Sequence, residues 1–201
     1  MKLLVIDLVA ALIFGGLISL AGKAGWLDAD NHAVADALSE FSPVLLFLLA
    51  VIIVPLFEEL IFRLPLRYET NPVAGVARLV TPTTSTPHDE ELAADRRAIW
   101  DRYYPWIFYG LTTAFALIHL TNYSEWTLGV LLLTPLLVAP QFVMGAFAGY
   151  LRVRYGFGWA YALHALHNLA LLGPVLLFPD LLEEATTETT GFLVTLLTFA
   201  A

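Results

Sequence analysis

The sequence predicts an all-α protein, a single membrane domain built as a polytopic bundle of about six transmembrane helices. Hydrophobic residues make up 59% of the 201-residue chain and charged residues 14%, whereas a soluble domain has about 45–50% and about 25%. The apolar residues form long runs that are almost free of charge, and about 20 such residues suffice to cross a bilayer. The charged residues lie mostly between these runs.

The first expected span covers residues 3–21, which follow Lys2 and are apolar apart from Asp7. A cleaved signal peptide is the alternative, because Ser19-Leu20-Ala21 loosely resembles a cleavage site. The minimal basic region and the aspartate inside the apolar run favour a retained span. The polar connection that follows contains residues 33–38, which can form a short interfacial helix.

The second expected span begins near Pro43 and ends at residue 66 or 68. Residues 69–102 form the only long polar segment of the chain, and we interpret it as a cytoplasmic insertion. Its Thr- and Pro-rich part, residues 81–87, has the composition of a loop. Residues 88–101 mix both charge signs and are expected to form a solvated amphipathic helix, not a separate domain.

The remaining apolar runs complete the bundle. The third expected span begins near Tyr104, with Pro105 in its first helical turn. The fourth contains Pro135 and Pro140, which predict a kink. It also carries Gly145 and Gly149, whose spacing permits close helix contact. The last four expected spans are residues 104–121, 126–151, 157–178 and the short run 191–201, which is either tilted or truncated.

The loop charges predict the orientation and exclude some functions. If the N-terminus is cytoplasmic, all of the 10 basic residues except Lys23 fall on cytoplasmic segments, as the positive-inside rule expects. Both termini of this integral membrane protein are therefore predicted to be cytoplasmic. The chain has no cysteine for disulfides or thiolate sites. No basic patch with interleaved aromatic residues points to nucleic acid.

The most informative stretch is residues 57–63, where Glu58, Glu59 and Arg63 interrupt an apolar run. A charge near the bilayer centre costs roughly 2.5–3.5 kcal/mol on insertion scales. Glu59 and Arg63 are four residues apart and can pair on one helix face. Glu58 points about 100° away from Glu59, so a structural ion pair does not account for it. We interpret Glu58 as a candidate general base.

Two later spans supply candidate partners for Glu58. His119 lies in the third span, one turn after Phe115, and His164 and Asn168 share one face of the fifth span. The last two can direct two donors to one point, as an oxyanion site requires, or can tie two helices together. His167 lies one turn from His164 and is expected to be a supporting residue.

Three motifs occur in a fixed order: Glu-Glu-x-x-x-Arg at 58–63, Phe-x-x-x-His at 115–119 and His-x-x-x-Asn at 164–168. Together with the Gly-x-x-x-Gly-Tyr-Leu run before the third motif, they resemble the CPBP family. This family comprises the CAAX-protease and bacteriocin-processing (Abi-like) intramembrane proteases, including type II CAAX prenyl proteases. The resemblance covers about residues 43–175. It implies an intramembrane peptidase acting on a membrane-anchored protein or peptide, prenylated or not.

The resemblance also implies roles for the site residues. Glu58 would activate a water with the help of His119, and His164 and Asn168 would stabilise the oxyanion, with Glu59 and Arg63 in support. The family has been described both as glutamate proteases and as metalloproteases, and a zinc ion held by Glu58, His119 and His164 is chemically possible. We prefer the metal-free version, because these residues form a complete general-base and oxyanion set.

Other functions remain as alternatives. A non-catalytic immunity or scaffold protein could use the same polar cluster for packing. An ion or proton pathway is disfavoured, because the chain lacks internal repeats and charged residues in each of several helices. The insertion at 69–102 departs from the family, whose members usually bridge the first two motifs briefly. It can gate substrate entry or contact a partner.

Overall fold

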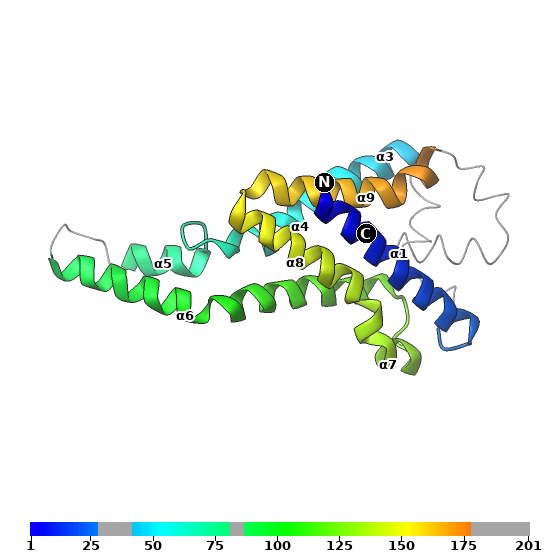
Figure 1. The fold of residues 1–201 in the computed structure, drawn as a ribbon, viewed down its shortest axis with the longest axis horizontal. Coiled ribbons are helices and arrows are strands. Elements are labelled where there is room, and N and C mark those ends of the chain that lie inside the picture. Colours follow the sequence, from blue (N-terminus) through cyan, green and yellow to red (C-terminus); the bar gives the residue numbers. More distant parts are fainter. Residues whose placement is uncertain (28–41, 81–86, 178–201) are drawn as a thin grey trace.

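A computed structural model of the chain describes residues 1–27, 42–80 and 87–177, and all regular structure in these ranges is helical (Figure 1). The prediction of an all-α membrane bundle is confirmed. The described elements are α1 (Lys2–Lys23), α3 (Pro43–Phe47), the π-helical segment η1 (Leu48–Ile53), α4 (Val54–Phe62), the 3-10 turn η2 (Leu64–Leu66), α5 (Pro72–Val80), α6 (Pro87–Ile118), the 3-10 turn η3 (His119–Asn122), α7 (Leu128–Leu137), α8 (Ala139–Arg154) and α9 (Phe157–Leu177).

Three helical stretches in the described residues are long and apolar enough to cross a membrane: Lys2–Lys23, Val44–Leu66 and Leu128–Arg154. The expected third and fifth spans correspond to the second part of α6 and to α9. The expected sixth span at 191–201 and the interfacial helix at 33–38 lie outside the described residues. Six crossings fit this arrangement and, like the cytoplasmic position of both termini, stay a prediction.

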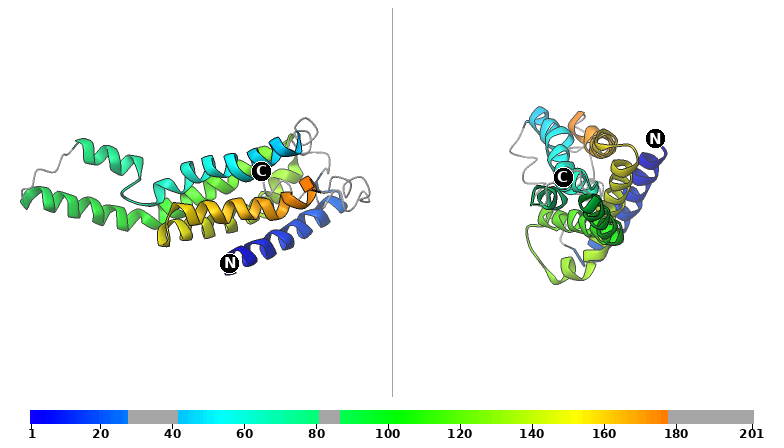
Figure 2. Two further views of the ribbon diagram at one scale, coloured as in Figure 1. Left: turned by 90° about the horizontal axis from the view of Figure 1, so that it is seen from above. Right: turned by 90° about the vertical axis from the view of Figure 1, so that its left-hand side faces the viewer.

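Helix α8 lies at the centre of the bundle, where it packs against α9, α6 and α1 (Figures 1 and 2). Two glycines make its contact with α6 close. A Cβ atom on Gly149 would lie 2.8 Å from Cε2 of Phe108, and one on Gly145 would lie 3.1 Å from Cδ1 of Phe115. Both distances are shorter than ordinary van der Waals contact, so the predicted close helix packing at these glycines is confirmed.

The prediction that Pro105 lies in the first turn of a helix is wrong, whereas the start of the third span near Tyr104 stays a prediction. Helix α6 runs unbroken from Pro87 to Ile118 and contains Pro105 in its interior. A proline there removes one backbone hydrogen bond to the carbonyl of Asp101. Asp101 and its neighbour Arg102 are exposed, so water can hydrate that carbonyl and the helix can continue. The solvated helix and the third span are therefore one element.

The kink predicted in the fourth span is a break. α7 ends at Leu137 and α8 begins at Ala139, with Val138 between them. Pro140 has no N–H and takes the second position of α8, where no intrahelical donor is needed. Figure 1 shows α7 turned away from the axis of α8.

The first residues of the insertion are anchored to the bundle, because Asn71 donates from Nδ2 to the carbonyl oxygen of Pro65 at 2.9 Å and Arg152 of α8 donates from Nη2 to Oγ1 of Thr70 at 3.0 Å. The Asn71 side chain accepts hydrogen bonds from the amides of Val73 (3.0 Å) and Ala74 (3.1 Å), which caps α5. Glu69 pairs with Arg97 of α6 at 3.0 Å. The pKa of Glu69 lies below its ordinary value of 4.5, first because its own backbone amide donates to it and then because Arg97 does. Figure 2 shows α5 beside the outer half of α6, beyond the bundle.

Candidate active site

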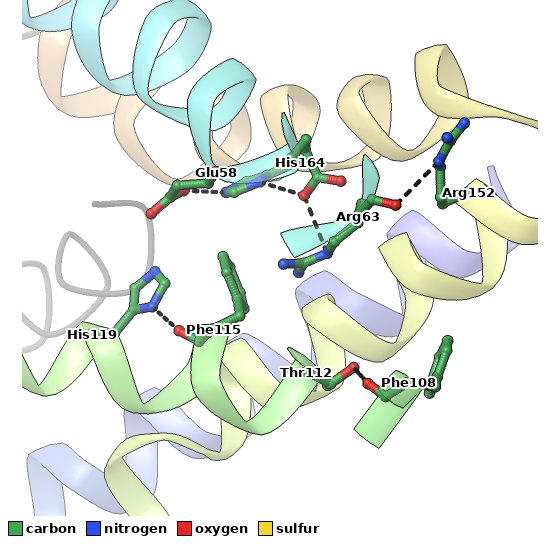
Figure 3. Close-up of polar contacts among 9 residues, drawn as sticks. Glu58, Arg63, Phe108, Thr112, Phe115, His119, Arg152 and His164 are labelled. Carbon is green, nitrogen blue, oxygen red and sulfur yellow. Dashed lines mark hydrogen bonds and ion pairs between the residues drawn. The ribbon is translucent and has the colours of Figure 1, made fainter. Parts of the chain in front are cut away.

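The motif residues of α4 and α9 meet at the imidazole ring of His164 (Figure 3). Its Nδ1 lies 3.0 Å from Oε1 of Glu59, and its Nε2 lies 3.4 Å from Oε2 of Glu58. Each ring nitrogen thus faces one of the two adjacent glutamates. The ring is fully buried, whereas the side chain of Glu58 keeps 17% of its surface exposed.

Glu59 contributes more than an ion pair with its helix neighbour. Its Oε1 lies 3.5 Å from Nε of Arg63, as the four-residue spacing predicted, but the same oxygen makes the closer contact to His164. A carboxylate only accepts hydrogen bonds, so Nδ1 of His164 carries a proton. Glu59 therefore fixes which edge of the ring faces Glu58, in addition to its pairing with Arg63.

Phe115 packs at the centre of the polar groups and is fully buried. The Arg63 guanidinium lies over its ring, with Cζ 3.8 Å from the centroid, which is a favourable cation–π geometry. The rings of His119 and His164 contact Phe115 edge-to-face at 4.7 Å and 5.7 Å between centroids. Gly145 on α8 leaves room for this stack, because a Cβ there would lie 3.0 Å from Nη2 of Arg63.

His119 begins the 3-10 turn that ends α6, and it is 6% exposed. Its Nδ1 donates a hydrogen bond of 2.8 Å to the carbonyl oxygen of Phe115. In a neutral ring Nε2 is then the acceptor. Figure 3 shows this edge of the ring pointing toward the Glu58 carboxylate. No hydrogen bond or ion pair joins the two side chains directly, so only one of the two expected histidines contacts Glu58.

Asn168 donates from Nδ2 to the carbonyl oxygen of Ala50 at 2.7 Å, and the sequence explains why that carbonyl accepts. In the π-helical segment η1, the backbone N–H of Val54 donates a hydrogen bond to the carbonyl oxygen of Leu49, five residues earlier. In the same pattern, residue 55 would donate to the carbonyl oxygen of Ala50, but residue 55 is proline and has no N–H. Asn168 replaces this missing donor, as neighbouring helices do for prolines within membranes.

A second side chain of α9 reaches the same segment. The Tyr161 hydroxyl donates to the carbonyl oxygen of Ile52 at 3.2 Å. Two α9 side chains thus hold the backbone just before the glutamates of α4. The expected oxyanion role of Asn168 stays a prediction.

The side-chain hydrogen bond of His167 goes to Asp7 and not to His164 or the glutamates. Its Nδ1 donates to Oδ2 of Asp7 at 2.5 Å, and both residues are 1% exposed. Asp7 belongs to α1, so this bond joins the first helix to the helix that carries the third motif. The sequence indicated both residues as costly polar groups in apolar spans, but it gave no sign that they pair.

The arrangement of donors does not fit a zinc site of Glu58, His119 and His164. Within residues 1–27, 42–80 and 87–177, no three His, Asp or Glu side chains converge in a way that could hold a metal ion. Among these three side chains the shortest contact is the 3.4 Å between Nε2 of His164 and Oε2 of Glu58, and no hydrogen bond or ion pair joins His119 to either of them.

The fold and the site together describe an integral membrane protein with a buried glutamate–histidine cluster between its helices. Comparison with protein families gives the narrower assignment. Residues 40–170 match the sequence model of the Rce1-like family, type II CAAX prenyl endopeptidase Rce1-like. The match covers more than half of the chain, so the chain belongs to this family. No curated protein and no solved structure matches it significantly.

Family membership confirms the resemblance read from the three motifs. It makes the protein a protease by class, and it implies a membrane-associated substrate.

Proposed function

We propose that this protein is an intramembrane endopeptidase that hydrolyses a peptide bond of a membrane-anchored protein or peptide. A prenylated CAAX-type peptide is the substrate that family membership favours. One observation carries the proposal: His164 lies between two carboxylates, of which Glu59 is fully buried and Glu58 alone retains exposed surface. Only an accessible carboxylate can meet both a water molecule and a substrate.

In the proposed first step, Glu58 takes a proton from a water whose oxygen attacks the scissile carbonyl carbon. The position of His119 supports a water at this point. Its Nδ1–H is used by the Phe115 carbonyl, so Nε2 can accept the second hydrogen of a water that lies between the ring and Glu58. Two acceptors would then orient the water for attack.

The attack moves an electron pair onto the carbonyl oxygen, and the resulting oxyanion needs hydrogen-bond donors. His164 donates from Nε2 while Glu59 holds the proton on Nδ1, so a carboxylate offsets the positive charge of the doubly protonated ring. Asn168, one turn further along α9, supplies its amide as a second donor. When the intermediate collapses, the carbon–nitrogen bond breaks and the amine leaves with the proton from Glu58.

The test is cleavage by purified protein in lipid nanodiscs, using a fluorogenic farnesylated CAAX peptide and the same peptide without the lipid. Glu58→Gln keeps the size of the side chain and removes the base, so we expect the rate to fall by about 100- to 10,000-fold. Glu91→Gln changes the same residue type at an exposed position of α6 and serves as the matched control. Wild-type rates in a folded Glu58→Gln protein would refute this mechanism.

A further inference from the structure

The buried pair of Asp7 and His167 is not used in the proposed mechanism. Asp7 lies on the buried stripe of α1 together with Ala11, Gly15 and Ile18. This stripe faces the bundle, and Ala11 and Ile18 belong to the same apolar cluster as Leu171 and Leu172 of α9. A single polar residue in that stripe meets a single polar residue on α9, inside an otherwise apolar contact.

Packing alone does not account for the aspartate. Its Oδ2 accepts the Nδ1–H of His167, whereas its Oδ1 is buried without a hydrogen-bond partner among the described residues. Burying a carboxylate that is only half satisfied costs free energy that an apolar residue would avoid. The aspartate therefore has a role other than stabilising the contact between α1 and α9. What it adds to that contact is a directional hydrogen bond.

We propose that Asp7 is a positioning residue of the active site, acting through His167 on the rotation of α9 about its axis. This inference rests on the proposed function. His167 directly precedes Asn168 and lies one turn from His164, so the three side chains move together when α9 turns. At about 100° per residue, His167 lies about 60° around the axis of α9 from His164 and about 100° from Asn168, so the bond to Asp7 holds a side of the helix next to the side that carries the α4 contacts. The first helix, which lies outside the matched residues 40–170, is thereby part of the catalytic scaffold.

A small rotation of α9 about its axis would be enough to displace the side chains of the site. Side-chain tips lie about 5–6 Å from a helix axis, so a rotation of about 10° moves them by about 1 Å. A displacement of about 1 Å at a reacting group can cost about 100-fold in rate. Such a rotation would separate His164 from Glu58, whose contact is already 3.4 Å long.

The experiment measures kcat and KM per folded molecule in nanodiscs, with the folded fraction determined by gel filtration and thermal unfolding. We expect Asp7→Leu to lower kcat by about 10- to 100-fold and to change KM by less than about threefold. Asp7→Asn can still accept from His167 and should retain most of the rate. The matched control is Ile6→Ala, at a neighbouring position of α1 that is 53% exposed.

A charge-swapped double variant, Asp7→His with His167→Asp, recreates the pair in the opposite direction and should recover kcat. If Asp7→Leu does not fold, the double variant still tests the positioning role of Asp7. Wild-type kcat per folded molecule in Asp7→Leu, or a folded but inactive swap, would overturn the positioning role. If the wild-type protein cleaves nothing, the proposed function fails, and that result is distinct from an active enzyme that is insensitive to Asp7.

Discussion

Replacing Glu59 with glutamine tests how the buried charges of this site depend on one another. Glu59 and Arg63 are 0% and 1% exposed, and glutamine keeps the size of the side chain while removing its charge. The Arg63 guanidinium would then be buried against the ring of Phe115 without a carboxylate at 3.5 Å. A buried charge that loses its partner is the costly case among ion-pair substitutions.

The magnitude follows from the contacts. Breaking a buried pair by removing one partner costs about 3–5 kcal/mol. The glutamine oxygen can still accept the Nδ1–H of His164, which retains about 1 kcal/mol of hydrogen-bond free energy. We therefore expect Glu59→Gln to lower the free energy of unfolding by about 3 kcal/mol. Arg63→Met should cost a similar amount, because it leaves Glu59 as the unpaired charge.

The double variant Glu59→Gln/Arg63→Met separates this explanation from simple loss of packing. With both charges removed, the site contains two residues of nearly the original volume and no buried ion, so the double variant should be more stable than either single variant. Equilibrium unfolding of the purified proteins in mixed micelles provides the four free energies of the cycle. If the loss in the double variant equals the sum of the two single losses, the two charges are not coupled and the reasoning is refuted.

Four further predictions test other parts of the structure. Gly149→Ala places a methyl group 2.8 Å from Phe108 and should destabilise the protein by about 1–3 kcal/mol in unfolding experiments. Pro55→Ala restores a backbone donor, so Asn168→Ala should cost less stability in that background than in the native chain. The pKa of Glu69 in the folded protein lies below its ordinary value of 4.5. The stabilisation of the insertion by Glu69 should therefore be fully present above pH 4.5 and be lost as the pH falls through the pKa of the folded protein. Hydrogen exchange of the insertion measures this loss. Chelator treatment should leave peptidase activity unchanged, with metal analysis of the same sample as the check.

The sequence was sufficient for the parts of the site that depend on helical spacing. The four-residue separation of Glu59 and Arg63 predicted their pairing, and the order of the three motifs predicted the family. Spacing also placed His164 and Asn168 on one side of α9. These features follow from a period of 3.6 residues, which any uninterrupted helix obeys.

Features that depend on the packing of distant helices could not be predicted in this way. The π-helical segment η1 exists beside α9, where Asn168 supplies the donor that Pro55 lacks. Nothing near residue 50 in the sequence specifies that donor. The pairing of Asp7 with His167 has the same origin, because it depends on which helices become neighbours in the bundle. The unbroken α6 shows the reverse case, in which Pro105 gives a local signal for a helix start but lies inside a continuous helix.

The distribution of carboxylates among the histidines also bears on which residue reacts. Asp7 and Glu59 are both fully buried, and each accepts the Nδ1–H of a histidine of α9. Such carboxylates can orient a ring but cannot reach a water or a substrate. Glu58 faces Nε2 of His164, with 17% of its side chain exposed, so it can exchange partners during a reaction. An exposed carboxylate beside a histidine held by a buried one is an arrangement suited to proton transfer, and the two adjacent glutamates therefore have different tasks even though they lie on the same turn of one helix.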